Sequence, residues 1–273
     1  MSERFSADYS DANTSAAGRR GGDQRDVAAL VAAIDAGLRE RATADRAERE
    51  RAYLKSEIEH YGVTVPQTRA AVKAALKGVE LGHDELIDSA TRLWEKPVHE
   101  RRAAAAALIE ARSALLVPED IVLLERFLRE SRTWALVDDI SASIVGPLVE
   151  RTEHGDNGGD GARLAAVLDR WADDGDFWIR RSALLAHLIP LREGRGDFER
   201  FGRYADGMLD EREFFIRKAI GWVLRDMSRK RPEMVYKWIE QRAARASGLT
   251  VREAIRRLPE AQQAAVIAAR ESR

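Results

Sequence analysis

The sequence has 273 residues, of which 45% are hydrophobic and 33% are charged, and its formal net charge at pH 7 is -1. The absence of cysteine excludes a disulfide framework, a thiol nucleophile and a cysteine-based zinc site. The near-zero net charge argues against a uniformly basic nucleic-acid-binding protein, although a local basic patch remains compatible with it.

The N-terminal segment differs in composition from the remainder. Residues 1–24 are rich in Ser, Gly, Asp and Arg, which predicts a disordered extension without the apolar segment of a secretory signal. No run of about 18 apolar residues follows, so we expect no membrane span. Together with the absence of cysteine, this favours a cytoplasmic location. The five histidines show no metal-ligand spacing, and we expect neither a metal nor a cofactor.

Residues 25–273 have the pattern of a single all-α domain. Helix-favouring segments of about 12 to 18 residues are separated by Gly and Pro, and alternating strand patterns are missing. A longer break at residues 154–161, HGDNGGDG, predicts a flexible loop. A series of short helices joined by short turns is typical of an α-solenoid of HEAT or armadillo type, which presents a concave face to a large ligand. A compact helical domain without repeats is the alternative.

The expected helix 133–149 carries an aspartate at the edge of its apolar face. At about 100° per residue the core positions are Val137, Ile140, Ile144 and Leu148. Trp134 and Asp138 are four residues apart and lie side by side, whereas Asp139 points away from the core. Asp138 is therefore a candidate electrostatic or general-base group. The alternative is a surface aspartate favoured by the helix dipole.

The expected helix 176–189 has a cation on its apolar face. Arg181 falls among the apolar positions Phe177, Leu184, Leu185 and Leu188. An arginine in such a place needs a partner or must extend to solvent. It forms either an internal ion pair with a carboxylate or a contact with an anionic ligand such as a phosphate.

The expected helix 213–228 has an aromatic residue away from its core positions, which are Ile216, Ala219, Ile220, Val223 and Met227. Trp222 is surrounded instead by Lys218, Arg225 and Arg229. An aromatic side chain among cations is typical of a nucleic-acid surface, and packing against a neighbouring repeat is the alternative. Residues 177–231 contain 13 Lys and Arg against 8 Asp and Glu, so cations are concentrated in this half of the chain.

From Tyr53 to Leu258 the sequence resembles the AlkD-type DNA alkylation repair family, the HEAT-like DNA glycosylases. The resemblance starts at Tyr53-Leu-Lys and Gly62-Val-Thr-Val-Pro66 and continues through Leu93-Trp94. Its most specific parts are Trp134-x-x-x-Asp138, the segment FWIRR at 177–181 and the segment EFFIRKAIGWVLR at 213–225.

The resemblance implies a function for individual residues. Asp138 would be the catalytic carboxylate, and Trp134 and Trp222 would flank the sugar of the damaged nucleotide. The DNA-contacting or supporting residues implied are Arg181, Tyr53, Phe214, Phe215 and Arg225. Lys218, which neighbours Trp222 on the expected helix, is a further candidate DNA contact. We expect replacement of Arg181 or Arg225 by Ala to weaken DNA binding.

The implied reaction is hydrolysis of the N-glycosidic bond of a cationic N3- or N7-alkylated purine in double-stranded DNA. Asp138 would stabilise positive charge on the deoxyribose and position water, without metal and without a general acid. We expect a monomer associated with the nucleoid. A non-catalytic DNA-binding protein of the same superfamily and a protein-interaction scaffold are the alternatives.

Overall fold

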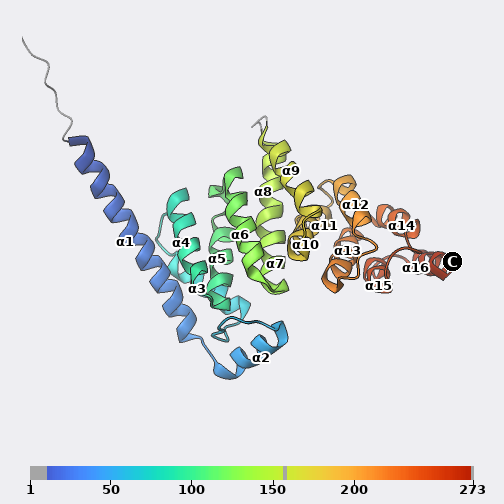
Figure 1. The fold of residues 1–273 in the computed structure, drawn as a ribbon, viewed down its shortest axis with the longest axis horizontal. Coiled ribbons are helices and arrows are strands. Elements are labelled where there is room, and N and C mark those ends of the chain that lie inside the picture. Colours follow the sequence, from blue (N-terminus) through green and yellow to red (C-terminus); the bar gives the residue numbers. More distant parts are fainter. Residues whose placement is uncertain (1–10, 156–158, 272–273) are drawn as a thin grey trace, which may run out of the picture. The chain divides into compact units, whose positions relative to one another are not determined.

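The computed structural model describes residues 11–155 and 159–271, and side chains from residue 26 onward. Within these residues the regular structure is helical, apart from one isolated bridge between Glu59 and Val98. The all-α prediction is therefore confirmed (Figure 1). Among the described helices, none is both long enough and apolar enough to cross a membrane.

The chain divides into two compact units, which are described separately. Unit 1 comprises Met1–Tyr53 with Glu57–Leu115, and unit 2 comprises Leu54–Ser56 with Leu116–Arg273. The predicted single domain over residues 25–273 and the predicted concave face stay predictions. Residues 1–10 of the predicted N-terminal extension lie outside the described residues. Residues 11–24 belong to the first helix, and their side chains are not described, so the boundary at residue 24 also stays a prediction.

Unit 1 consists of helices that pack on one another with short connections. The helices are α1 (Asp11–Glu40), α2 (Ala44–Leu54), α3 (Val65–Ala75), α4 (His83–Glu95), α5 (His99–Ala111) and the 3₁₀ turn Ser113–Leu115. α4 and α5 are in contact and are joined by three residues, which gives the antiparallel pairing predicted from the sequence. α5 lies deep in the unit, and its residues Ala104, Ala105, Leu108 and Ile109 are fully buried.

The connection between α2 and α3 is held by one buried carboxylate. Glu100, in the first turn of α5, accepts hydrogen bonds from the backbone amides of Tyr61, Gly62 and Val63 at 2.9, 2.6 and 3.0 Å. Gly62 has φ +78°, and a Cβ there would lie 2.1 Å from the carbonyl oxygen of Thr43. A glycine is required at this turn both for its backbone angle and for the close approach of the two segments.

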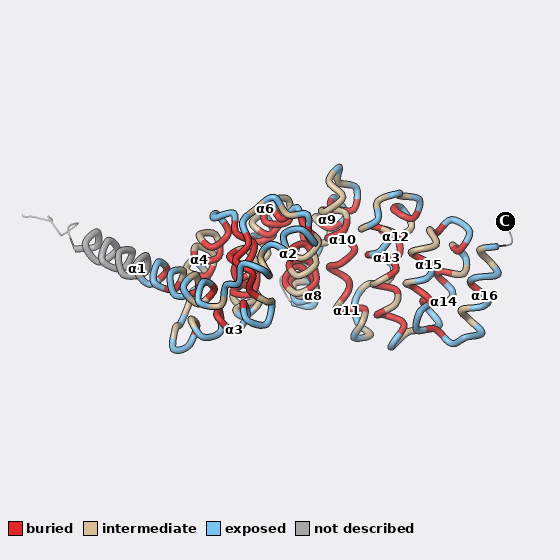
Figure 2. The backbone as a smooth tube through the Cα atoms, turned by 90° about the horizontal axis from the view of Figure 1, so that it is seen from below, coloured by how far each residue is buried: buried red, intermediate tan, exposed pale blue. Residues whose placement is uncertain are grey.

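Unit 2 continues the series of short helices. They are the 3₁₀ turn Pro118–Asp120, α6 (Ile121–Ser131), α7 (Trp134–Ile140), a π-helical segment (Ser141–Val145), α8 (Gly146–His154), α9 (Asp160–Ala172), α10 (Phe177–Leu185), α11 (Leu188–Arg192), α12 (Phe198–Gly207), α13 (Phe214–Met227), α14 (Pro232–Glu240), α15 (Gly248–Ile255) and α16 (Glu260–Glu271). α10 packs on α6, α7, α9 and α13, and it is therefore central to the unit. Figure 2 shows buried residues along α10 and α13.

The core positions predicted for the helix 213–228 are confirmed. The five residues Ile216, Ala219, Ile220, Val223 and Met227 are all buried, and the helix begins after Glu213, whose side chain accepts a hydrogen bond from the Phe215 amide. The helix 133–149 is confirmed in its core positions but is interrupted by the π-helical segment Ser141–Val145. Residues 156–158 of the predicted loop lie outside the described residues.

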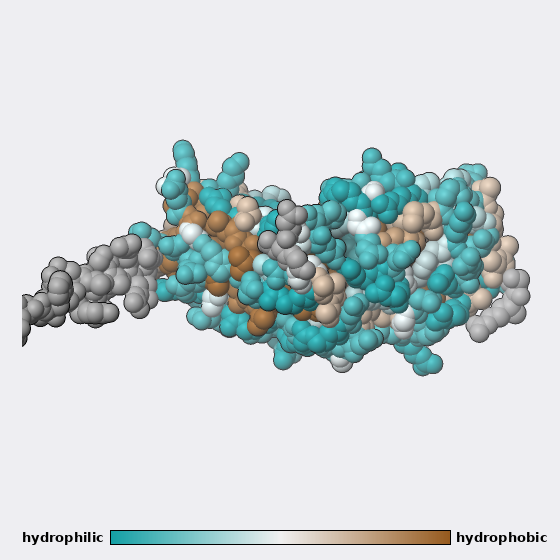
Figure 3. All heavy atoms as spheres, turned by 90° about the horizontal axis from the view of Figure 1, so that it is seen from above, coloured by the Kyte–Doolittle hydropathy of each residue, from teal (hydrophilic) through white to brown (hydrophobic). Residues whose placement is uncertain are grey.

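The face of the molecule in Figure 3 is largely hydrophilic, with hydrophobic residues gathered in a band along part of it. In unit 2, the helices α13 and α15 approach each other closely. A Cβ placed on Gly221 would lie 2.5 Å from the Cβ of Glu253 and 3.0 Å from the carbonyl oxygen of Thr250.

We expect Gly221→Ala to lower the free energy of unfolding by about 1–3 kcal/mol, because the added methyl group must push α13 and α15 apart. Urea denaturation followed by circular dichroism measures the change. Gly207→Ala is the matched control, since an added Cβ at Gly207 meets no atom within 4 Å. Equal effects of the two substitutions would show that the close approach at Gly221 does not limit packing.

Candidate functional site

The carboxylate of Asp138 lies at the edge of the core, as the helical pattern predicts. Val137 and Ile140 beside it are fully buried, and the side chain of Asp138 is 14% exposed. α7 begins after Thr133, whose extended backbone ends the left-handed turn at Arg132. The π-helical segment that follows adds one residue to a helical turn just after Asp138. Such segments are frequent at functional sites.

Asp138 and Arg181 form a buried ion pair between α7 and α10. The Nε and Nη2 atoms of Arg181 donate to Oδ1 and Oδ2 of Asp138 at 2.7 and 2.8 Å, and the side chain of Arg181 is 3% exposed. This is the two-pronged geometry in which a guanidinium binds an ionised carboxylate. The interpretation of Arg181 as an internal ion pair is therefore correct, and its partner is the candidate catalytic carboxylate itself.

A third helix, α13, also contacts Arg181 and helps to hold it in place. Its Nη1 atom donates to the carbonyl oxygen of Phe215 in the first turn of α13, and its guanidinium carbon lies 5.7 Å from the centre of the Phe215 ring. Arg181 therefore connects α7, α10 and α13 through polar groups. Because the guanidinium has its donors in one rigid plane, it fixes the orientation of the Asp138 carboxylate.

The electrostatic environment of Asp138 combines burial with cations. Burial raises the pKa of Asp138 above its usual value, whereas the hydrogen bonds and the charge of Arg181 and the charge of Lys218 act to lower it. A carboxylate partly removed from water interacts more strongly with charge that develops nearby than an exposed one does. The site is therefore suited to stabilising a cation at the open edge of Asp138.

Aromatic rings cover the side of the ion pair that faces α13. Phe177 and Trp178 of α10 lie 6.3 and 4.8 Å from Phe215, measured between ring centres, and Phe214 meets Phe215 edge-on at 5.3 Å. Phe214 is 51% exposed, and the Nζ atom of Lys218 lies 5.7 Å from its ring centre. The segments FWIRR and EFFIRK are thus brought together as one surface.

Trp134 and Trp222 are both half-buried, on α7 and α13. α10 packs on each of these two helices, so the two tryptophans and Asp138 come from elements that surround α10. Partial exposure of an indole is what contact with a ligand requires, and it is compatible with packing against a neighbouring helix as well. The assignment of these tryptophans to a substrate site stays a prediction.

The structure shows the surroundings of two further predicted DNA-contacting residues, Arg225 and Tyr53. The Nη1 atom of Arg225 binds Oε2 of Glu253 on α15, and the side chain of Arg225 is only 18% exposed. A DNA contact by Arg225 would compete with this ion pair. Tyr53 belongs to unit 1, at the end of α2, and is 72% exposed. Both assignments stay predictions.

Sequence reasoning missed several members of this site. Trp178 packs on Phe215, the Phe215 carbonyl binds Arg181, and Glu253 pairs with Arg225. A backbone carbonyl has no sequence signal, and Glu253 is one of many acidic residues in the chain. Trp178 lies inside the segment FWIRR and could have been singled out, because it is an aromatic residue three positions before Arg181 and therefore lies on the same side of the helix.

Comparison with known proteins decides the family. The family model described as DNA alkylation repair enzyme matches residues 34–258. The chain belongs to this family. The match includes α7, α10 and α13 and therefore the whole Asp138–Arg181 site. No curated protein matches the sequence.

Two solved structures of such repair proteins are similar to the chain. A predicted DNA alkylation repair enzyme from Enterococcus faecalis has a TM-score of 0.65 at 23% identity, covering 81% of this chain and 98% of that one. The Pseudomonas fluorescens alkylpurine DNA glycosylase AlkC, bound to DNA containing an abasic site analog, has a TM-score of 0.46 at 16% identity, covering 90% of this chain and 65% of that one. At these identities, the first likeness supports the helical fold alone.

Proposed function

We propose that this DNA alkylation repair enzyme is a monofunctional DNA glycosylase of the AlkD type. It would hydrolyse the N-glycosidic bond of cationic N3- or N7-alkylated purines in double-stranded DNA. The observation that carries the proposal is the half-buried Asp138 carboxylate, which a guanidinium holds in one orientation beside an aromatic and cationic surface. We further propose that the protein acts as a cytoplasmic, nucleoid-associated monomer.

The chemistry of the substrate explains why one carboxylate is sufficient. An alkylated purine already carries positive charge and leaves without protonation by a general acid. Breaking the bond moves positive charge to the deoxyribose, where an ionised carboxylate stabilises it and orients the attacking water. Arg181 occupies one lone pair on each Asp138 oxygen, and each oxygen keeps another for substrate or water.

The surrounding residues would position the DNA. Trp134 and Trp222 have half-buried indoles, and the face of an indole attracts a cation such as the developing cationic sugar. Lys218 is exposed beside Phe214 and is available to a backbone phosphate. Arg181, by contrast, is buried and paired, so its contribution is to fix Asp138 rather than to meet DNA directly. In this respect the proposal differs from the contact implied by the resemblance.

A non-catalytic DNA-binding protein of the same superfamily is the second candidate. The observation that favours it is the internal pairing of both Arg181 and Arg225, which makes each of them part of the packing. Such a protein would bind DNA through exposed cations such as Lys218, and the Asp138–Arg181 pair would hold helices together without any reaction.

The test is release of free base from methylated DNA. Duplex DNA treated with a methylating agent is incubated with the protein, and soluble 3-methyladenine and 7-methylguanine are separated by chromatography. We expect release from methylated duplex and none from untreated duplex. Binding of both duplexes without release of base would support the non-catalytic candidate, and absence of DNA binding would support a protein-interaction scaffold.

We expect Lys218→Ala to weaken binding to duplex DNA by removing one phosphate contact. Because each neutralised phosphate contributes about 0.9 to the slope of log affinity against log salt, the slope should become shallower by about one unit. Lys237→Ala on α14 is the matched control, an exposed lysine on another helix. Salt titrations by fluorescence anisotropy measure both. Identical slopes for wild type and Lys218→Ala would remove Lys218 from the DNA surface.

A further inference from the structure

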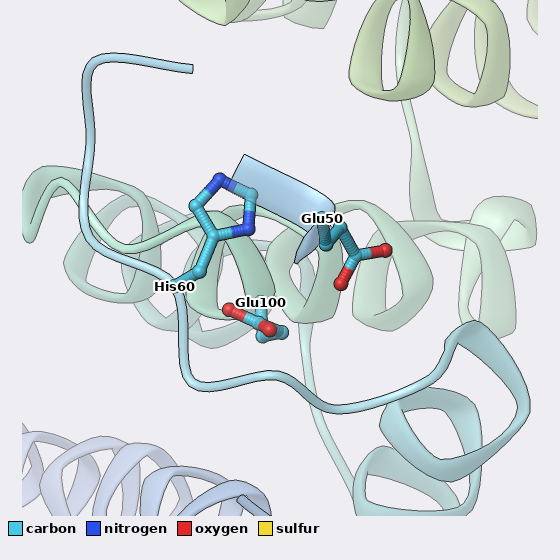
Figure 4. A group of neighbouring side chains, drawn as sticks. All are labelled: Glu50, His60 and Glu100. Atoms are coloured by element: carbon cyan, nitrogen blue, oxygen red, sulfur yellow. The ribbon is translucent and has the colours of Figure 1, made fainter. Parts of the chain in front are cut away.

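A second cluster of chemically active side chains lies in unit 1. Glu50 of α2, His60 of the connection to α3 and Glu100 of α5 each offer a ligand atom, and the three atoms lie within 4.8 Å of one another. Figure 4 shows the three side chains arranged around one space. The Asp138–Arg181 site belongs to unit 2, so the cluster is made of none of the same residues or helices.

His60 is the residue that points to a ligand. It is 91% buried, since its exposure is 9%, and among the described residues neither of its ring nitrogens has a hydrogen-bond partner. A buried polar atom without a partner is destabilising, so two such atoms on one ring call for an explanation. The His99 ring stacks on it at 4.6 Å and 6°, which fixes the plane of the imidazole.

Each of the two carboxylates, Glu50 and Glu100, has an oxygen that can still bind a ligand. Within the described part of the chain, Oε2 of Glu50 is buried without a hydrogen-bond partner, while Oε1 accepts from Arg46 at 3.2 Å. Oε1 of Glu100 accepts hydrogen bonds from two backbone amides. Among the described residues, its Oε2 accepts a hydrogen bond only from the amide of Tyr61 and keeps a lone pair. Each residue can therefore give one atom to a shared ligand without giving up its present contacts.

The charges of the cluster favour a dication. Two carboxylates close together in a buried place repel each other, and burial raises the pKa of Glu50, with the Glu100 charge adding to the rise. Burial also lowers the pKa of His60, which leaves a neutral imidazole with a lone pair for a metal. A divalent cation would neutralise the carboxylates and bind the ring nitrogen at once.

We propose that Glu50, His60 and Glu100 form a binding site for a divalent transition-metal ion of the zinc type. An imidazole nitrogen and carboxylate oxygens are ligand types that zinc accepts, and water would complete a tetrahedral set. Zinc–ligand bonds of about 2.0–2.2 Å place ligands about 3–3.5 Å apart, so small side-chain rotations bring the three atoms together. The ion would join α2 and the following connection to the first turn of α5.

Zinc binding by the full chain is the direct measurement. The protein is stripped with a chelator, dialysed, and titrated with zinc chloride by calorimetry, with magnesium chloride as the comparison ion. We expect one zinc per chain and a rise in melting temperature with zinc, because the ion binds the folded state. Magnesium should produce neither effect, since it prefers an all-oxygen set of ligands.

Substitutions of the cluster residues test whether zinc binds at this cluster. His60→Ala and Glu50→Gln should each weaken zinc binding at least tenfold. The matched controls His154→Ala and Glu48→Gln, both on the exposed surface, should leave it unchanged. If His60→Ala fails to fold, Glu50→Gln decides alone, because Glu50 is only half-buried and lies on α2. No zinc bound by wild type, or equal binding by the cluster variants and their controls, would overturn the proposal. Base release is not part of this test, so the glycosylase proposal stands or fails independently.

Discussion

Base release by Asp138→Asn is expected to fall by on the order of 10²–10³-fold relative to wild type, the loss that follows removal of one electrostatic group from a transition state. Asparagine keeps the shape of the side chain and an oxygen for Arg181, but it carries no negative charge. The charge that develops on the deoxyribose would then lack its stabilising partner. Single-turnover release of 7-methylguanine from methylated duplex measures the effect.

Asp139→Asn is the matched control for this substitution. It makes the same chemical change one residue along α7, on a side chain that is also half-buried. The control should retain base release within a few-fold, and both variants should keep wild-type affinity for duplex DNA. Release by Asp138→Asn at the wild-type rate would show that Asp138 is not the catalytic carboxylate, and equal losses in both variants would indicate a general effect of charge on α7.

Much of the helical arrangement could be predicted because periodicity is a local property. The expected helix 213–228 agrees with α13 to within a residue at each end, and its five core positions are all buried. An apolar residue every three or four positions leaves a helix few ways to orient itself. The π-helical segment after α7 has no comparable periodic signal in the sequence.

The partnership at the site could not be predicted from the same pattern. The sequence marks Asp138 and Arg181 as unusual in their own helices, but 43 residues separate them. The sequence alone therefore leaves two interpretations open for each residue. The contact of α7 with α10 in the folded structure brings Asp138 and Arg181 together. The cluster of Glu50, His60 and Glu100 could not be predicted from the sequence either. Glu50 and His60 lie on α2 and on the connection from α2 to α3, whereas Glu100 lies on α5.

Removing Arg181 should destabilise the protein far more than removing a surface arginine. Arg181→Met leaves the Asp138 carboxylate buried without its cation, for which we expect a loss of about 3–5 kcal/mol in the free energy of unfolding. Arg245→Met is the control. Arg245 is 45% exposed and pairs with Asp206 and Asp210, so its loss should cost at most about 1 kcal/mol. Urea denaturation measures both.

The double variant Asp138→Leu/Arg181→Met separates stability from chemistry. Replacing both charged side chains by apolar groups removes the desolvation free energy of burying two charges. Such replacements are often neutral or stabilising. We therefore expect the double variant to recover most of the stability that Arg181→Met loses and to release no base. A cycle of the two single variants and the double variant gives the coupling energy. Losses that simply add would mean that the pair does not act as a unit. A stable but inactive double variant would instead mean that folding does not need the two charges, which leaves the reaction as the reason for their presence.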